Sequence, residues 1–431
     1  MINELSLEMS TAIIDSAKLF YVCLVSHGMK SQKLVSNEFI ILMASLMSLV
    51  ALSIDTLLPA LPLIGDSLNV VDPTRNQLLI TMIFLGLGFG QLVFGPLSDS
   101  FGRKSIVYFG FIVFAIASII CVTTKSFEMM IVGRILQGIG LSSPRTIAIA
   151  MVRDTFSGDY MAKVLSIIVV FFILVPVVAP TLGQFILNFS DWRMIFSINL
   201  LLGVGIVVWF WLRQPETLEK SKRIKFSLSL FNDGLKEFMR FKQSIAYTLV
   251  SGFITGSFMV YLSTSQQIFQ DQYDLGEMFP YIFASTAIAI GAATFLNSRL
   301  VMRFGSRRLA FIAVSSYFLV SLLYVLLFSN GVNPSVYVLI GFFLVQFFSI
   351  GLIFGNVRSL AMEPLGHIAG IGAAINGFVS TVMAVPIAYF IGGYVKVSVL
   401  PLFVGFTIFG FLSVLVFVYL QRSHVKAAVT A

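Results

Sequence analysis

Apolar stretches long enough to cross a lipid bilayer follow one another along almost the whole chain. A helix needs about 20 mainly apolar residues to cross the roughly 30 Å hydrocarbon layer. The 431 residues are 58% hydrophobic and only 11% charged, whereas a soluble domain carries about 25% charged residues. This composition cannot cover an apolar core with a polar surface. We therefore expect an all-α membrane protein whose solvent is the lipid bilayer.

The apolar stretches divide into two sets of six. The predicted spans are 37–62, 75–97, 104–123, 127–150, 160–189, 193–213, 243–270, 276–299, 306–329, 333–360, 367–394 and 397–421. The long polar interruption at 214–242 separates the sixth span from the seventh. We expect twelve transmembrane helices in two six-helix halves that enclose a site near the middle of the membrane. The predicted parts are a tail at 1–36, a half at 37–213, a central loop at 214–242, a half at 243–421 and a tail at 422–431.

The basic residues predict the orientation of these spans. Lys and Arg concentrate in cytoplasmic loops of membrane proteins. With both termini placed inside, 21 of the 28 basic residues fall on the inner side and four on the outer side, while three lie within spans. We expect a multi-pass protein of the inner (cytoplasmic) membrane with both termini in the cytoplasm. The same distribution explains the net charge of +8 without nucleic acid as a partner.

Other classes of protein lack their characteristic residues here. The two cysteines, Cys23 and Cys121, form neither a disulfide framework nor a metal-binding pattern, so we expect no metal and no cofactor. A phosphate-binding loop of an ATP-driven pump is missing, as is a potassium-channel filter sequence. A polytopic membrane enzyme is the rival class, but clustered catalytic residues at a membrane edge are not found. We expect a transporter that acts as a monomer.

Apart from charged residues near the span ends, four charged residues lie inside predicted spans, where charges are costly and mark functional sites. Asp55 lies about two turns below the outer end of the first span, and Arg134 lies at the same depth in the fourth, at 1.5 Å per residue. Their alternative role is a static structural ion pair. Arg145 follows Arg134 by eleven residues and shares its helical face, and Arg358 occupies the corresponding span of the second half. Arg358 has an alternative role as a residue that extends into cytoplasmic water.

A polar turn after the second span recurs six spans later. Gly95-Pro96-Leu97-Ser98-Asp99-Ser100-Phe101-Gly102-Arg103-Lys104 is followed, after the eighth span, by Arg303-Phe304-Gly305-Ser306-Arg307-Arg308. This recurrence at matching positions indicates two duplicated halves.

The first of these turns resembles the signature loop of the major facilitator superfamily. Arg134-Ile135-Leu136-Gln137-Gly138 resembles the helix 4 motif of its proton-driven members, and Val175 to Gln184 resembles the helix 5 antiporter motif. The chain from about 50 to 420 is similar to the Bcr/CflA (bicyclomycin-resistance) branch of proton-coupled drug exporters. Further segments that carry this similarity are Ser53 to Pro62, Asp191-Trp192-Arg193, Asn297-Ser298-Arg299 and Glu363 to Gly370.

The resemblance implies roles for individual residues. Asp55 and Arg134 would couple transport to protons, and the helix 5 residues would favour antiport. Asp99 and Arg103 would belong to a cytoplasmic gate. The residues implied in gating are Gly95, Asp99, Gly102, Arg103, Lys104, Gln137, Gly138, Pro176, Pro180 and Gly183.

Two kinds of cargo remain open. The resemblance implies proton-coupled export of small amphiphilic compounds by alternating access. Alternatively, Arg145 and Arg358 in one cavity would favour a dedicated exporter of an endogenous anionic metabolite, such as a carboxylate siderophore, because guanidinium groups bind carboxylates through two hydrogen bonds. The predicted substrate-binding residues are Asp55, Arg145, Arg358, Asn356, Phe258 and Tyr261.

Overall fold

The computed structural model describes residues 37–224 and 227–430, and every regular element among them is helical. The predicted tail at 1–36 lies outside the described residues. Residues 37–41 begin the first described helix, and the description below concerns the unit Leu42–Ala431.

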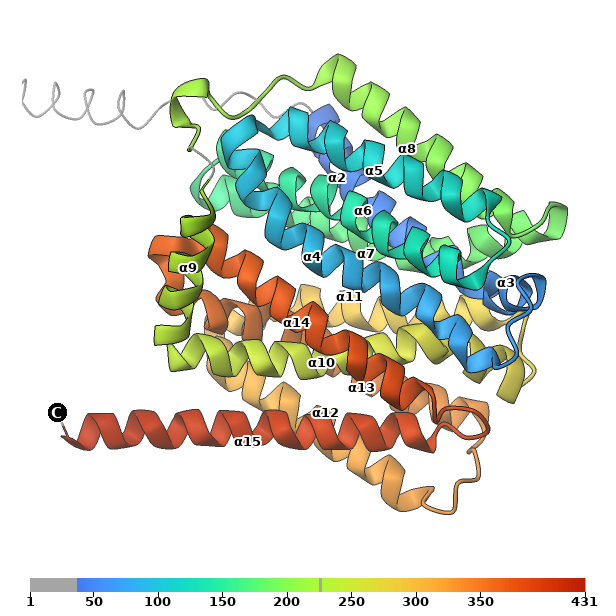
Figure 1. The fold of residues 1–431 in the computed structure, drawn as a ribbon. Coiled ribbons are helices and arrows are strands. Elements are labelled where there is room, and N and C mark those ends of the chain that lie inside the picture. The colour runs from blue at the N-terminus through green and yellow to red at the C-terminus, as the bar shows by residue number, and fades with distance from the viewer. Residues whose placement is uncertain (1–36, 225–226, 431) are drawn as a thin grey trace, which may run out of the picture. The chain divides into compact units, whose positions relative to one another are not determined.

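The N-terminal half is built of six long helical segments, the first of which is interrupted. They are α2 (Asn37–Asp55) continued by η1 (Leu58–Ala60) and α3 (Leu61–Ser67), η2 (Pro73–Gln77) leading into α4 (Leu78–Phe101), α5 (Arg103–Thr123), α6 (Phe127–Thr155), α7 (Gly158–Phe189) and α8 (Arg193–Arg213). Helix α4 packs along α6, and α5 packs against α6 and α8 (Figure 1).

The break in the first segment corrects the expectation of one continuous span at 37–62. Proline has no backbone N–H, and its ring clashes with the carbonyl four residues earlier. Pro59 therefore cannot donate to the carbonyl of Asp55, and α2 ends at that residue. Pro62 then stands at the start of α3. The segment that carries Asp55 therefore also contains Pro59, the residue that ends its helix.

The C-terminal half repeats this plan with a second set of six. Its members are α10 (Lys242–Gln266) continued by the π-helical η4 (Gln267–Gln272), α11 (Phe279–Phe304), α12 (Ser306–Leu327), α13 (Val336–Met362) followed by η5 (Glu363–Ile368), α14 (Ala369–Gly392) and α15 (Leu400–Thr430). Helix α10 packs against α14, and α12 packs against α13 and α15. Helix α15 continues past the predicted end at 421.

Two glycines show the duplication in the backbone. Gly102 (φ 97°) separates α4 from α5, and Gly305 (φ 77°) separates α11 from α12. Positive φ values are accessible to glycine without the penalty that a Cβ atom brings. The two recurring sequence turns therefore form the same kind of backbone reversal at matching places in the two halves.

The connection between the halves contains a helix that the sequence did not predict. Within 214–242, η3 (Lys220–Lys222) is followed by α9 (Leu228–Arg240), which packs against α10 and α14. Phe238 of α9 is buried with Leu365 and Ile375 of the C-terminal half. Helix α9 was not predicted because the segment is polar on average, although one face of the helix is apolar.

Eleven helices in the described part of the chain are long and apolar enough to cross a membrane, and α7 adds the shorter apolar stretch Leu174–Phe189. The halves meet where α4 packs along α14 and α7 packs along α11. These observations support twelve membrane-spanning segments in two halves. We call the end of the bundle at Gln77 the Asp72 end, and the opposite end of α4 the Arg103 end.

Candidate functional site

Asp55 lies at the interruption of the first segment and is 5% exposed. Among the described residues it has neither an ion-pair partner nor a hydrogen-bond partner. The following residue, Thr56, is fixed in place because its hydroxyl donates to the carbonyl of Leu52 at 2.6 Å and accepts from Asn199 of α8 at 3.0 Å. The carboxyl group of Asp55 is thus a buried acid at the last residue of α2, next to an anchored turn.

Arg134 of α6 is fully buried and bonds to backbone carbonyls of two other helices. Its Nε donates to the carbonyl of Leu79 at 2.7 Å, and its Nη1 donates to the carbonyl of Ser53 at 3.1 Å. Nη2 has no hydrogen-bond partner in the described part of the chain. Ser53 lies two residues before Asp55, so this bond places Arg134 close to the depth of Asp55 in the bundle, as expected. The alternative of a static Asp55–Arg134 ion pair is not observed among the described residues.

Gln137 and Gly138 place Arg134 within this bundle. Oε1 of Gln137 accepts from Arg134 at 2.9 Å, and its Nε2 donates to Ser118 of α5 at 2.9 Å. A Cβ atom at Gly138 would collide with the carbonyl of Ile83 on α4. The helix 4 motif therefore supplies a hydrogen-bonded side chain and a point of close helix approach.

Helix α7 contacts the interruption beside Asp55. Gly183 packs against the backbone carbonyl of Thr56 and the ring of Pro59, leaving no room for a Cβ atom. Pro180 is buried and Pro176 is half-buried on the same helix. Because α7 also packs against α11 of the other half, it connects the turn that follows Asp55 with the boundary between the halves.

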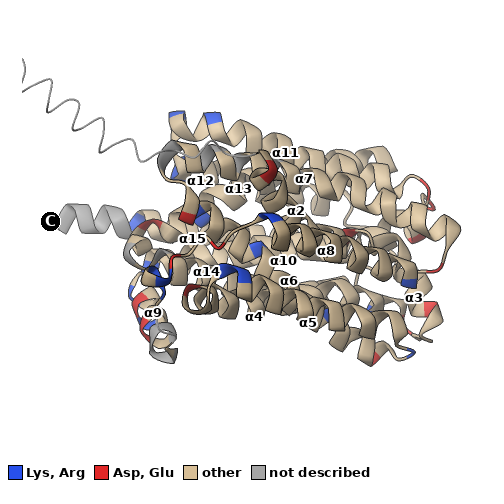
Figure 2. Cartoon of the chain, turned by 90° about the horizontal axis from the view of Figure 1, so that it is seen from above, with Lys and Arg blue, Asp and Glu red and all other residues tan. Residues whose placement is uncertain are grey.

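At the Arg103 end, the predicted gating residues form a charged network. The guanidinium of Arg103 donates to Asp99, to Ser98 at 2.7 Å and to Asp154 at the end of α6 at 2.8 Å. The described contacts of this network lie within the N-terminal half and the central connection. Figure 2 shows that most charged residues lie at the two ends of the helices.

Glu216 of the central connection completes the network. Its carboxylate accepts from the backbone N–H of Arg103 at 3.0 Å and of Lys104 at 3.1 Å, which caps the N-terminus of α5. The side chain of Lys104 donates to the carbonyl of Trp211, and Gly95 lies near Thr146. Sequence reasoning missed Asp154 and Glu216. The available signal was that two basic residues at a helix start need acidic partners.

Arg145 of one half and Arg358 of the other lie within range of electrostatic repulsion. Arg145 of α6 is half-buried and Arg358 of α13 is exposed, and their guanidinium groups are electrostatic neighbours. Arg153 is a further electrostatic neighbour of Arg358. Neither Arg145 nor Arg358 has an acidic partner among the described residues. Arg145, Arg153 and Arg358 together place three positive charges toward the Arg103 end of the bundle.

The remaining predicted substrate-binding residues are more deeply packed. Tyr261 is 1% exposed, its ring is tilted against that of Phe347 at a centroid distance of 4.4 Å, and it shares a hydrogen bond with Thr286 at 3.1 Å. It has no open face for a ligand in this arrangement. Phe258 is half-buried between Phe347 and Phe354.

Asn356 is also engaged by its neighbours. It is buried, and its Nδ2 donates to Asn297 of α11 at 2.6 Å. This bond joins α13 to α11, so the amide supports the packing that positions Arg358 two residues later.

At the Asp72 end, side chains connect the two halves directly. Nε2 of Gln77 donates to Oε1 of Gln267 at 2.9 Å and to the carbonyl of Gly392 at 3.2 Å. Lys396 pairs with Asp72 at 3.4 Å. Polar bonds between η2, η4 and α14 therefore close this end, while Arg358 is exposed nearer the other end.

Comparison with known proteins agrees with this architecture. The sequence profile described as Major Facilitator Superfamily matches residues 43–387. The bicyclomycin resistance protein homolog of Haemophilus influenzae is 30% identical over 383 residues, which cover 84% of this chain and 94% of that protein. The multidrug resistance protein MdtL of Shewanella oneidensis is 27% identical over 331 residues, covering 75% and 81%.

A solved structure shows the same fold. The crystal structure of a D-xylose-proton symporter aligns with a TM-score of 0.68 at 14% identity, covering 89% of this chain and 97% of that one. The chain belongs to the Major Facilitator Superfamily. It is a multi-pass membrane transporter that resembles drug exporters of this family.

Proposed function

We propose that the protein is a proton-coupled exporter, an antiporter that moves small amphiphilic compounds by alternating access. The observation that carries this proposal is Asp55, a buried acid without a counterion among the described residues. Ionising such a group costs free energy unless a cation or water reaches it. Proton binding removes that cost, so a movement that changes access to Asp55 also changes whether it holds a proton.

The neighbours of Asp55 support a coupling role. Thr56, the next residue, contacts Gly183 of α7, and α7 packs against the opposite half. A movement between the halves would therefore reach the turn that follows Asp55. The names of the Haemophilus and Shewanella relatives, which refer to bicyclomycin and multidrug resistance, support an amphiphilic drug as cargo.

The test is Asp55→Asn, which keeps the size of the side chain and removes its charge. We expect the variant to insert and fold normally but to lose uphill transport driven by a pH gradient in proteoliposomes. Asp233→Asn, at an exposed acid of α9, is the matched control and should transport normally. Proton release on substrate addition at the normal rate in Asp55→Asn would exclude Asp55 as the coupling residue.

We further propose that the protein lies in the inner membrane with both termini in the cytoplasm. The support is the excess of basic residues on one side, 21 against four. Single cysteines placed at Lys222 and at Val332, in a background without Cys23 and Cys121, should react with an impermeant thiol reagent from opposite sides. In intact spheroplasts, the cysteine at Val332 should react and the one at Lys222 should not.

An anionic cargo is the second candidate, and the Arg145–Arg358 pair favours it. Two guanidinium groups from opposite halves, without acidic partners in the described part of the chain, are a strong attraction for a carboxylate or phosphate. An endogenous metabolite with several carboxylates would neutralise them. The cluster also suits an amphiphilic drug that carries one acidic group.

Ligand binding distinguishes these cargo classes. Purified wild type, Arg145→Ala and Arg358→Ala are titrated with matched neutral, cationic and carboxylate ligands. We expect both variants to lose affinity for the carboxylate series alone, by roughly tenfold for one charge-assisted contact. Equal carboxylate affinities in the three proteins would exclude this site for an anionic cargo.

A further inference from the structure

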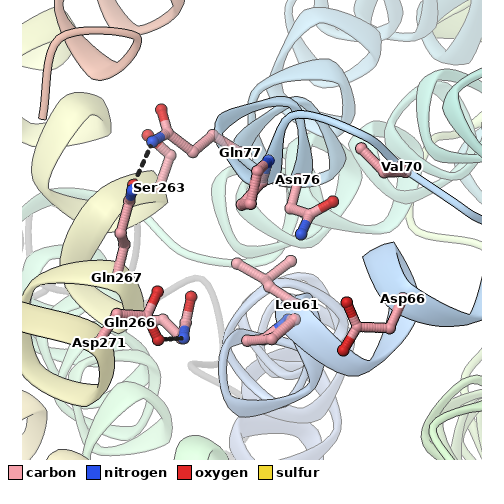
Figure 3. A pocket seen from close by; sticks show the side chains of 11 residues that line it. Leu61, Asp66, Val70, Asn76, Gln77, Ser263, Gln266, Gln267 and Asp271 are labelled. Carbon is pink, nitrogen blue, oxygen red and sulfur yellow. Dashed lines mark hydrogen bonds between the residues drawn. The ribbon is translucent and has the colours of Figure 1, made fainter. Parts of the chain in front are cut away.

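A polar cavity lies between the two halves at the Asp72 end. It has a volume of about 170 Å³ and is bordered by α3 and η2 of the N-terminal half and by α10 and η4 of the C-terminal half. Figure 3 shows Asp66 and Asp271 on opposite sides of this space, with Asn76 between the helices. The volume accommodates several water molecules or a hydrated ion, since one water occupies about 30 Å³ of liquid.

The residues that line the cavity include two acids and no basic residue. Asp66 and Asp271 are exposed at the rim, and the other polar lining side chains are amides and a serine hydroxyl. Lys396 is not part of the lining and pairs with Asp72 instead. The two carboxylates therefore have no cation to balance them within the cavity.

Asn76 supplies an independent indication of a ligand. Its side chain lines the cavity, the residue is only 7% exposed, and its Oδ1 accepts no hydrogen bond in the described part of the chain. A buried carbonyl oxygen without a donor is energetically costly. A cation that reaches this oxygen would satisfy the acceptor.

The π-helical segment η4 explains how the opposite wall is arranged. Such segments are rare and occur frequently at functional sites, because the extra residue in the turn changes where side chains point. Gln267, the first residue of η4, bonds to Gln77, while Asp271 in the same segment accepts from Gln266 at 3.2 Å. The π-helical segment thus carries both Gln267, which bonds to the other half, and Asp271, which lines the cavity.

We propose that this cavity binds a hydrated hard metal cation, of the class of Na⁺, Mg²⁺ or Ca²⁺. The available ligands are carboxylate and amide oxygens, which hard cations prefer. Mg²⁺ in particular keeps several waters and binds through one or two carboxylates. Because the lining comes from both halves, a bound ion stabilises the arrangement in which the Asp72 end is closed. The proposal does not depend on proton coupling or on the nature of the cargo.

Thermal unfolding of the purified protein tests the site. Full-length protein is melted in NaCl, MgCl₂ or CaCl₂ and in choline chloride at equal ionic strength, since choline is too large and too weakly coordinating to replace a hydrated metal ion. We expect at least one metal salt to raise the Tm by about 2 °C or more over choline. The salt that does so identifies a monovalent or a divalent site.

Variants then assign the effect to the cavity. Asp66→Asn and Asp271→Asn should each reduce the metal-dependent rise, and the double variant should abolish it. Asp274→Asn is the matched control, because Asp274 lies three residues from Asp271 and does not line the cavity. Equal Tm values for wild type in all salts would overturn the proposal, as would an undiminished rise in the double variant.

Discussion

Gly183 on α7 lies directly against the backbone carbonyl of Thr56, the residue that follows Asp55. The contact requires glycine because any Cβ atom there would overlap the carbonyl oxygen. The ring of Pro59, the residue that interrupts the helix, lies against the same glycine. The helix 5 motif and the buried acid, far apart in sequence, are thus parts of one packed unit.

Gly183→Ala should therefore disturb the turn beside Asp55. Overpacking of this kind costs about 1–3 kcal/mol, and we expect a lower Tm together with reduced transport in proteoliposomes. Gly205→Ala is the matched control, because no atom lies within 4 Å of a Cβ placed at Gly205 of α8. Similar Tm and transport values for the two variants would show that the Gly183 contact is not important.

Arg134→Met should lower stability strongly, although Arg134 forms no ion pair with Asp55. The substitution removes the hydrogen bonds to the carbonyls of Leu79 and Ser53 and to Oε1 of Gln137. The Ser53 carbonyl then has no donor among the described residues, because the N–H of Leu57 bonds to Ile54 instead, and a buried unpaired group costs about 1–3 kcal/mol. Arg75→Met, at a side chain that is 50% exposed, provides the control. The measurement is thermal unfolding in detergent, and equal losses for the two variants would contradict the hydrogen-bonding role.

The bond between Gln77 and Gln267 should break during transport if the halves separate at the Asp72 end. Cysteines at both positions, in a background without Cys23 and Cys121, can be joined by a short bifunctional thiol reagent. We expect the cross-link to stop transport and a reducible linker to restore it on reduction. The single-cysteine variants serve as controls. Normal transport by fully cross-linked protein would show that this end does not open.

The Asp72–Lys396 pair should not sense pH in the physiological range. Hydrogen bonds from the side chain and backbone of Thr74, followed by Lys396, lower the pKa of Asp72 below its usual value of 3.8. A lowered pKa means that the contribution of the carboxylate is present above 3.8 and is lost only as the pH falls through the lower, folded-state value. Being exposed, this pair adds little stability.

The reactivity of a single cysteine placed at Val71 toward a thiol reagent measures how accessible the Asp72 end is. Between pH 5 and pH 7.5, after correction for thiol ionisation, we expect no change that depends on Asp72. Asp72→Asn should show the same pH profile as wild type over that interval. A step in accessibility between these pH values that disappears in Asp72→Asn would contradict the prediction.

The sequence by itself determined the membrane environment, the two sets of six spans and the family. These follow from local properties: about 20 apolar residues must be helical in lipid because each backbone group has to be satisfied within its own segment. The turns at Gly102 and Gly305 could also be predicted from the sequence, because they depend on short recurring segments of the chain. Even the break at Asp55 has a local cause in Pro59, although the apolar pattern, which runs on through the proline, concealed it.

Only the tertiary structure decided which groups meet. Arg134 bonds to backbone carbonyls, which no sequence motif displays, because every residue carries one. Glu216 and Asp154 reach Arg103 from distant segments, and Gln77 meets Gln267 across the halves. Such pairings depend on how α4, α6 and α10 pack in three dimensions, since a single polar side chain has many possible partners until packing brings one of them within hydrogen-bond distance.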